Sequence, residues 1–179
     1  MAYINGTRLD AIKVGSTAEG VNLASLVGRS ITNVTEENLA GAKSIGAYAF
    51  YQCESLTSVV IPDSVTNIYM YAFSECTALK SVVIPNSVSM IGEGAFSECT
   101  SLENIEIPAS VYSIAGNAFG GCKNLKTVTV LRSSPPSLMF GNPFDNEYIT
   151  TIYIPAGTLS AYQSATNWSS FADKFVELT

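Results

Sequence analysis

Four cysteines are the residues of this chain whose side chains could support the most varied chemistry. A thiolate can bind zinc, form a disulfide or act as a nucleophile. The four recur every 23 residues, as Cys53, Cys76, Cys99 and Cys122, with no Cys-x-x-Cys pair and no histidine in the sequence. Metal and redox motifs typically use paired cysteines or Cys/His sets. The even spacing instead predicts one buried thiol in each unit of a repeat, because free cysteine behaves as a small hydrophobe.

Carboxylates offer a second possible chemistry. Glu75 and Glu98 are also 23 residues apart, and two carboxylates in register could do acid–base work or bind Ca²⁺. Repetition explains them more simply, as solvent-facing turn residues of successive units. The chain has no histidine to act as a general base, no nucleophile-elbow motif and no phosphate-binding glycine loop. We therefore expect no enzymatic activity, no metal site and no cofactor.

The cysteines belong to a phrase that is written four times between Ile45 and Val130. Each copy contains Ile, Ala-Phe, Cys and Leu-x-x-Val/Ile-x-Ile/Val, and its phenylalanine is Phe50, Phe73, Phe96 or Phe119. A period of about 20–29 residues with this leucine spacing is typical of leucine-rich repeat solenoids. A single coil cannot bury both sides of its apolar residues. The phenylalanines and cysteines are therefore predicted to form two ladders through the stacked coils.

The elements that position these side chains follow from the same phrase. Leu-x-x-Val-x-Ile predicts one short parallel β-strand in each coil, and Pro62, Pro85 or Pro108 ends it because proline cannot donate to a strand ladder. The return around Ala-Phe-x-x-Cys is too short for a long helix, so we expect an irregular, 3₁₀ or single-turn helical segment. The sequence thus predicts a right-handed, α/β-type leucine-rich repeat solenoid that is capped at both ends.

Three segments are expected along the chain. Residues 1–30 lack the repeat and should form an N-terminal cap, with a hairpin at Asn5-Gly6 and a short helix within residues 17–27. Residues 31–155 carry the repeats, of which the first is degenerate with a two-residue insertion, and the last has an unusual return without cysteine. Residues 156–179 should form a C-terminal cap. It would comprise a short helix with Thr158 as N-cap, an aromatic plug and a final strand within residues 174–178.

Composition narrows the range of partners. Fifteen acidic and nine basic residues give the 179-residue chain a net charge of −6, so nucleic acid is not an expected partner. No apolar run reaches the roughly 18 residues of a membrane span, and we expect no membrane insertion. Residues 1–6 also lack the pattern of a secretory leader. Two alternatives stay open: the protein is not exported by that route, or a leader has been removed.

The concave side of the predicted sheet should present the variable positions of each copy. One column is Thr57, Lys80, Glu103 and Lys126; a second is Ser58, Ser81, Asn104 and Thr127; a third is Val60, Val83, Glu106 and Thr129. Neighbouring parallel strands lie about 4.8 Å apart, so Lys80, Glu103 and Lys126 could pair across coils as a solvated charge ladder. The alternative is that these three residues and Glu106 contribute to a binding surface.

Aromatic residues, which are favoured at binding hot spots, gather in the returns rather than in those columns. They are Tyr48, Tyr51, Tyr69, Tyr71 and Tyr112. The tripeptide Tyr69-Met70-Tyr71 stands where the next copy has Gly92-Glu93-Gly94. These rings either fill gaps between turns or form an exposed edge that binds a partner, and the sequence leaves both interpretations open.

The phrase Ile-Gly-x-x-Ala-Phe-x-x-Cys-x-x-Leu-x-x-Val/Ile-x-Ile-Pro, best seen from Ile91 to Pro108, resembles the BspA-like leucine-rich repeat family. Residues 154–162 with Asn167-Trp168 are similar to the C-terminal cap common in such proteins of gut and oral bacteria. The resemblance implies a non-enzymatic adhesion module at the cell surface or outside the cell, with a protein or glycan partner. Similar short chains also resemble phage-encoded proteins, which implies the alternative of a structural or receptor-binding component of a virion or tail.

Overall fold

The structure is a computed structural model that describes residues 3–4, 7–8, 31–145 and 147–179. Near the N-terminus, β1 (Tyr3–Ile4) and β2 (Thr7–Arg8) pair antiparallel, where the Asn-Gly dipeptide predicts a hairpin. The short helix predicted within residues 17–27 lies outside the described residues. The capping role of residues 1–30 therefore stays a prediction.

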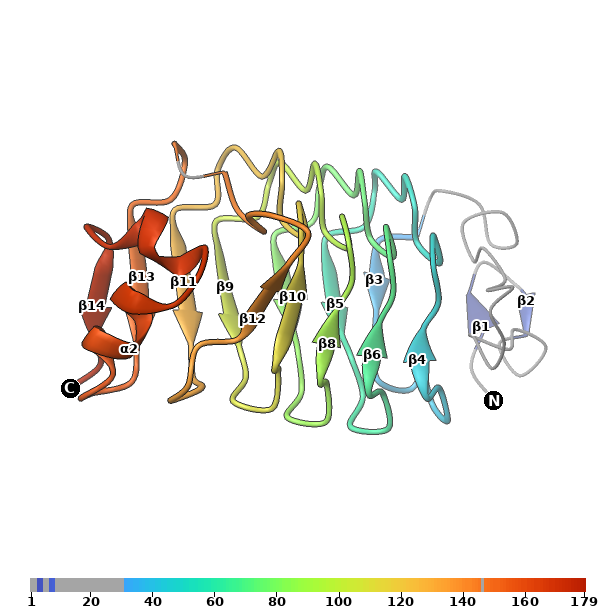
Figure 1. The fold of residues 1–179 in the computed structure, drawn as a ribbon. Helices are drawn as coiled ribbons and strands as arrows, with labels where there is room; N and C mark the ends of the chain where they lie inside the picture. The colour runs from blue at the N-terminus through green and yellow to red at the C-terminus, as the bar shows by residue number, and fades with distance from the viewer. Residues whose placement is uncertain (1–2, 5–6, 9–30, 146) are drawn as a thin grey trace.

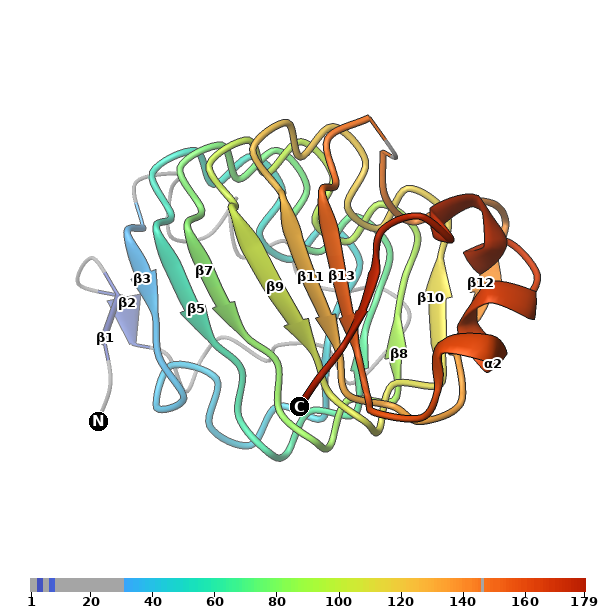
Figure 2. The same cartoon turned by 90° about the vertical axis from the view of Figure 1, so that its left-hand side faces the viewer.

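Short parallel strands at the Leu-x-x-Val-x-Ile positions, together with one strand of the C-terminal cap, form the first face of the solenoid (Figure 2). They are β3 (Asn33–Val34), β5 (Ser58–Val60), β7 (Ser81–Val83), β9 (Asn104–Ile107), β11 (Thr127–Val130), β13 (Thr151–Ile154) and β14 (Phe175–Glu177). The register follows the repeat, so that Ser58 lies beside Ser81 and Asn104 beside Thr127. The predicted parallel-strand solenoid is confirmed.

Each coil contributes a second strand that the sequence did not lead us to predict (Figure 1). These strands are β4 (Ser44–Ile45), β6 (Asn67–Ile68), β8 (Met90–Ile91), β10 (Ser113–Ala115) and β12 (Ser137–Met139). They form one parallel sheet in the order β12-β10-β8-β6-β4. Runs of two or three residues are too short to show the alternation by which a strand is recognised. Only the stacking of coils reveals this second sheet.

The return around Ala-Phe-x-x-Cys is irregular rather than helical. In one return, Tyr71 and Glu75 have positive φ angles of 52° and 60°, and such left-handed residues interrupt a right-handed helix. Main-chain bonds alternate between isolated turns, such as Ser74 N–H to the Tyr71 carbonyl at 3.2 Å, and bonds from coil to coil. The latter run from Phe73 N–H to the Ala95 carbonyl and from Glu75 N–H to the Ser97 carbonyl, both at 2.7 Å. Of the expected alternatives, the irregular return is the one that the structure shows.

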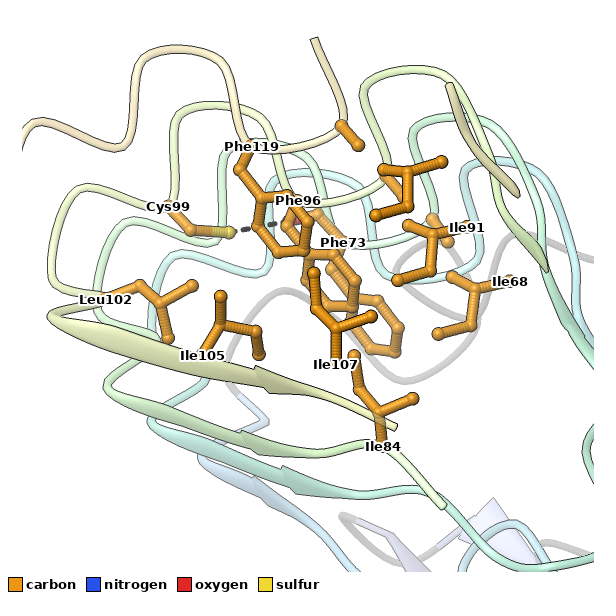
Figure 3. Close-up of a cluster of buried hydrophobic side chains, with 14 of the residues drawn as sticks. Ile68, Phe73, Ile84, Ile91, Phe96, Cys99, Leu102, Ile105, Ile107 and Phe119 are labelled. Atoms are coloured by element: carbon orange, nitrogen blue, oxygen red, sulfur yellow. Dashed lines mark hydrogen bonds between the residues drawn. The ribbon is translucent and has the colours of Figure 1, made fainter. Parts of the chain in front are cut away.

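The core between the two sheets consists of repeated side chains that stack coil on coil (Figure 3). The rings from Phe50 to Phe119 lie nearly parallel, with successive centroids 4.9, 5.2 and 5.3 Å apart. The Cys99 thiol donates to the Phe73 carbonyl at 3.2 Å. The equivalent bonds join Cys76 to Phe50 and Cys122 to Phe96. Successive coils are thus joined by both ring stacking and thiol hydrogen bonds.

The phenylalanine stack continues beyond the fourth copy. Phe144 lies over Phe119 with ring centroids 5.2 Å apart, and the two residues form a parallel bridge. The sequence predicts that residues 133–144 replace the usual return, and it does not predict that Phe144 joins the stack. Its place 25 residues after Phe119 hides it from a search with a fixed 23-residue step.

Helical turns and one strand close the C-terminal end. Trp168 and Phe171 belong to η2 (Trp168–Phe171), Tyr162 belongs to α2 (Leu159–Ser164), and all three side chains are fully buried. The Trp168 indole N–H donates to the Pro136 carbonyl at 2.7 Å. Beside them, β14 pairs parallel with β13 as the predicted final strand. Side-chain donors therefore satisfy main-chain acceptors that strand pairing does not reach.

Thr158 occupies the N-cap position of α2 but makes no side-chain cap. Its hydroxyl donates to the Pro155 carbonyl at 2.6 Å, and the Leu159 N–H instead donates to the Glu177 carboxylate at 2.9 Å. The predicted N-cap position of Thr158 is therefore confirmed, but the capping hydrogen bond expected from its side chain is not made. The capping carboxylate comes from β14, so it can be found only once the chain is folded.

Candidate functional site

Outward-facing residues of the first sheet include the predicted sheet-binding positions. Inward residues repeat from coil to coil, and Val59, Ile105 and Val128 are at most 3% exposed. Outward residues differ between coils: one column is Val60, Val83, Glu106, Thr129 and Tyr153. The column beside it is polar, with Asn33, Ser58, Ser81, Asn104, Thr127 and Thr151. Packing therefore restricts the inward positions and leaves the outward ones free to differ.

The charged candidates on this face do not form the ladder that the sequence allowed. Lys80, Glu103, Glu106 and Lys126 are all exposed. The Lys126 ammonium donates to the Lys123 carbonyl at 3.3 Å and lies 5.5 Å from the centroid of the Tyr148 ring. No ion pair links Lys80, Glu103 and Lys126 in the described part of the chain. The charges therefore remain available to solvent or a partner.

A break in the first sheet explains the missing pair between Lys80 and Glu103. The strands form two groups, β3-β5-β7 and β14-β13-β11-β9, and within residues 31–145 no backbone hydrogen bond joins β7 to β9. Val82 is partly exposed at this seam, whereas the equivalent Ile105 is buried. The second sheet stays continuous, with β8 paired to β10. The expected 4.8 Å spacing requires paired strands, so it does not apply between β7 and β9.

Three of the five tyrosines form a surface cluster. The rings of Tyr48 and Tyr71 stack with centroids 5.2 Å apart and an interplanar angle of 20°. Tyr51 meets Tyr48 edge-on at 5.7 Å and 85°. Tyr48 is 42% exposed, while Tyr51 and Tyr71 are half-buried. The rings therefore pack on one another and also remain at the surface, and binding of a partner by these tyrosines stays a prediction.

Two carboxylates complete this cluster. The Tyr51 hydroxyl donates to Glu75 Oε1 at 2.7 Å, and Gln52 Nε2 donates to Glu75 Oε2 at 2.9 Å. The Tyr71 hydroxyl donates to Glu93 Oε1 at 3.2 Å, and the nearby carboxylate raises the pKa of Tyr71. Gln52 and Glu93 are not among the site residues predicted from the sequence. Gln52 stands 23 residues before its partner Glu75, and Glu93 stands 22 residues after its partner Tyr71. Spacings equal or close to the repeat period were the signal that could have identified these two residues.

Tyr69 and Tyr112 lie outside the cluster and are more exposed. Tyr69 is 43% and Tyr112 is 54% exposed. A Cβ atom at Gly92 would meet the Met70 nitrogen at 2.7 Å and the Tyr69 carbonyl carbon at 2.8 Å, so glycine permits the close approach of these two coils. The five predicted tyrosines therefore do not form a single site.

The cysteine thiols have surroundings that oppose reactivity. All four are buried and none is in a disulfide. Burial raises the pKa of the Cys122 thiol to about 12, and burial is also the main cause of the raised pKa values of Cys76 and Cys99. The thiolate is the reactive form, so these side chains serve packing. Elsewhere in the described ranges, no group of three His, Cys, Asp or Glu residues is placed to hold a metal ion.

The repeated strands, stacked core and variable outward residues define a leucine-rich repeat solenoid, a class whose members are typically binding scaffolds without enzymatic activity. The family model for the BspA type leucine rich repeat region matches residues 43–171 in six copies, and the chain belongs to this family. That membership suggests a module for protein interaction. Within the described ranges, no helix has the length and apolar character needed to cross a bilayer.

Solved bacterial leucine-rich repeat proteins share the fold. A protein from Bacteroides ovatus is 30% identical with a TM-score of 0.55, the match covering 70% of this chain and 32% of that one. A leucine rich cell surface protein from Faecalibacterium prausnitzii is 25% identical with a TM-score of 0.56, covering 84% and 33%. The T. pallidum leucine rich repeat protein is 26% identical with a TM-score of 0.65, covering 85% and 70%.

This chain thus spans about a third of the length of the first two proteins. None of the curated proteins compared with the sequence matches it.

Proposed function

We propose that this chain is a binding module of a bacterial surface protein, and that it attaches to a protein or glycan through the outward face of the first sheet. The observation that carries the proposal is the contrast between inward residues that repeat and outward residues that do not. The column from Val60 to Tyr153 changes in size, polarity and charge while the buried column remains aliphatic. Stacking places no demand on those outward side chains, so their variety is available for recognition.

Two further features support this face. The exposed Lys80, Glu103 and Glu106 lie on both sides of the seam between β7 and β9, where main-chain groups are also not used in strand pairing. A partner can therefore be met by charge, hydroxyl groups and backbone together. A surface location is supported by the family and by the Faecalibacterium prausnitzii relative, which is described as a cell surface protein.

The test uses immobilised extracellular proteins and a glycan array. The variant Glu103→Lys/Glu106→Lys reverses two charges on the face, and Glu54→Lys/Asp63→Lys makes the same charge change at exposed residues outside its columns. Some proteins or glycans of the panel should bind the unaltered chain. We expect the first variant to lose that binding and the second variant to keep it. Equal binding by both variants, or loss in both, would place recognition elsewhere.

A further inference from the structure

Two tyrosines of the surface cluster occupy backbone positions that aromatic residues rarely adopt. Tyr48 and Tyr71 have φ angles of 58° and 52°. The equivalent residues of the next two coils are Gly94 and Asn117, at φ 58° and 54°. Glycine and asparagine adopt this left-handed conformation readily, whereas it is unfavourable for a bulky residue. The chain therefore carries tyrosine where its own repeat supplies two better-suited residues.

Packing accounts for only part of this choice. Tyr71 lies over Gly94, where a Cβ atom would collide with the tyrosine ring, and Tyr48 stacks on Tyr71. This contact is at the surface, because the interior is already filled by the phenylalanine stack. Tyr48 remains 42% exposed. Strained positions that persist without being needed for the core are typical of functional sites.

The groups around the rings are hydrogen-bond acceptors, the carboxylates of Glu75 and Glu93. Tyr51 and Tyr71 donate their hydroxyl protons to Glu75 and Glu93. A phenol that donates to a carboxylate becomes richer in electrons, which strengthens the attraction of its ring face for a cation. The net charge of −6 also attracts cations at long range. Tyr71 lies between Gly94 and Tyr48, so Tyr48 offers the more open ring face, and this face with the carboxylates of the cluster matches a ligand that is flat or compact, positively charged and rich in donors.

We propose that Tyr48, Tyr71 and Glu93, with Tyr51 and Glu75 beside them, form a binding site for an arginine or lysine side chain in a basic segment of a partner protein. We call this the tyrosine site. A guanidinium can stack on an aromatic ring while its N–H groups donate to a carboxylate, so arginine should bind better than lysine. The site lies in the returns, apart from the outward columns of the first sheet. It rests on the proposed function only in taking a protein as the partner.

The chain supplies its own control substitutions. Tyr71→Gly copies Gly94 and Tyr48→Asn copies Asn117, so each variant receives a residue suited to its backbone and should fold. Glu93→Gln removes the carboxylate charge while keeping an acceptor. Tyr112→Ser removes an exposed tyrosine outside the site and serves as the matched control. Circular dichroism melting of each variant establishes that it is folded before binding is measured.

The probe is the peptide Gly-Arg-Gly-Arg-Gly, with the glutamine and lysine versions for comparison, titrated while the tyrosine ring resonances are followed by NMR. We expect saturable shifts at Tyr48 and Tyr71 that weaken with salt and are absent with the glutamine peptide. Tyr71→Gly and Tyr48→Asn should each weaken binding by about two- to five-fold, and Glu93→Gln should also weaken it. Tyr112→Ser should not change it.

Three outcomes would overturn the proposal. They are the absence of saturable ring shifts, equal binding of the arginine and glutamine peptides, and full affinity in the double variant Tyr48→Asn/Tyr71→Gly. Val83→Thr alters the sheet face without changing charge, and peptide binding should be the same in this variant. The tyrosine site can therefore fail while the sheet face binds its partner, and the reverse outcome is equally distinguishable.

Discussion

Phe96 and Lys80 show at the residue scale how position in the repeat decides the contribution of a side chain. Phe96 contacts the rings of Phe73 and Phe119, with centroids at 5.2 and 5.3 Å, and has no exposed surface. Lys80 stands directly before β7, in the column of Thr57, Glu103 and Lys126, and is exposed. The two residues lie close together along the solenoid. A difference between them therefore reports burial rather than location along the solenoid.

Replacing these two residues by alanine should have very different effects. Phe96→Ala should lower the free energy of unfolding by about 3–5 kcal/mol, because it leaves a cavity between two fixed rings. Lys80→Ala should change it by less than about 0.5 kcal/mol. Urea unfolding followed by circular dichroism measures both values. Equal losses in the two variants would contradict the assignment of Phe96 to the stack.

The cysteine ladder predicts a loss of stability at high pH. The pKa of the Cys122 thiol is raised to about 12, and those of Cys76 and Cys99 are also raised, so the folded chain keeps protons that the unfolded chain releases near pH 8.5–9. The stabilising effect is complete below that range and is lost as pH rises toward 12. Tyr162, whose pKa burial also raises, acts in the same direction.

Melting temperatures measured from pH 7 to 11 test this behaviour. We expect a steady decline above about pH 9, and a shallower decline in Cys99→Ala than in the unaltered chain. Ala at position 99 lowers stability at every pH, so the slope is compared and not the absolute value. A melting temperature that stays constant up to pH 11 would contradict burial of the thiols.

At the scale of elements, the seam between β7 and β9 is the weakest junction of the first sheet. Lys80 and Lys126 donate their amide protons to the preceding coil, to the carbonyls of Thr57 and Glu103, both at 2.9 Å. In the described chain, Glu103 makes no corresponding backbone bond to Lys80. The second sheet and the phenylalanine stack hold the same two coils together. Among the described residues, the two coils are thus joined by strand pairing in the second sheet and not in the first.

Hydrogen exchange should reveal the seam directly. The amide of Glu103 should exchange at least about tenfold faster than those of Lys80 and Lys126, because exchange at a main-chain group outside the ladder requires little opening. Amide-resolved NMR under native conditions gives all three rates in one experiment. Similar protection at all three positions would show that β7 and β9 pair in solution.

The sequence predicts most of the molecule at the level of elements because each coil repeats the same packing problem. Strand positions and the Phe and Cys ladders follow from a fixed step, and the final strand follows from the need to cover an open sheet edge. The second sheet, the position of Phe144 and the Glu177 cap do not, because strands of two residues carry little pattern and insertions break the step. The seam is invisible to sequence reasoning, since Leu-x-x-Val/Ile-x-Ile is intact on both sides of it.

The candidate sites were predictable only in part. The repeat identifies which side chains face outward, so Lys80, Glu103, Glu106 and Lys126 could be selected as exposed. Whether they pair depends on the missing strand pairing between β7 and β9 and on the direction of the Lys126 side chain, which donates to the Lys123 carbonyl, and only the folded chain fixes both. The tyrosines could be listed, but their division into a stacked cluster and separate exposed rings depends on the turn geometry.

At the scale of the whole molecule, the chain separates two tasks between the two sides of each strand. Inward side chains join the coils through contacts that are nearly the same at each junction, and the outward side chains are free of that task. In such stacked proteins, stability is approximately a sum over neighbouring interfaces. Substitutions confined to the outward face should therefore leave every one of those interfaces intact.

Binding by a block variant of the outward column tests this separation most directly. In Val60→Thr/Val83→Thr/Glu106→Thr/Tyr153→Thr, threonine suits an exposed strand position, so the melting temperature should stay within a few degrees of the original. Against the same panel of extracellular proteins and glycans, the folded variant should lose the binding that the unaltered chain shows. Binding at full strength, or collapse of the fold, would contradict the assignment of recognition to the outward face and of stability to the buried one.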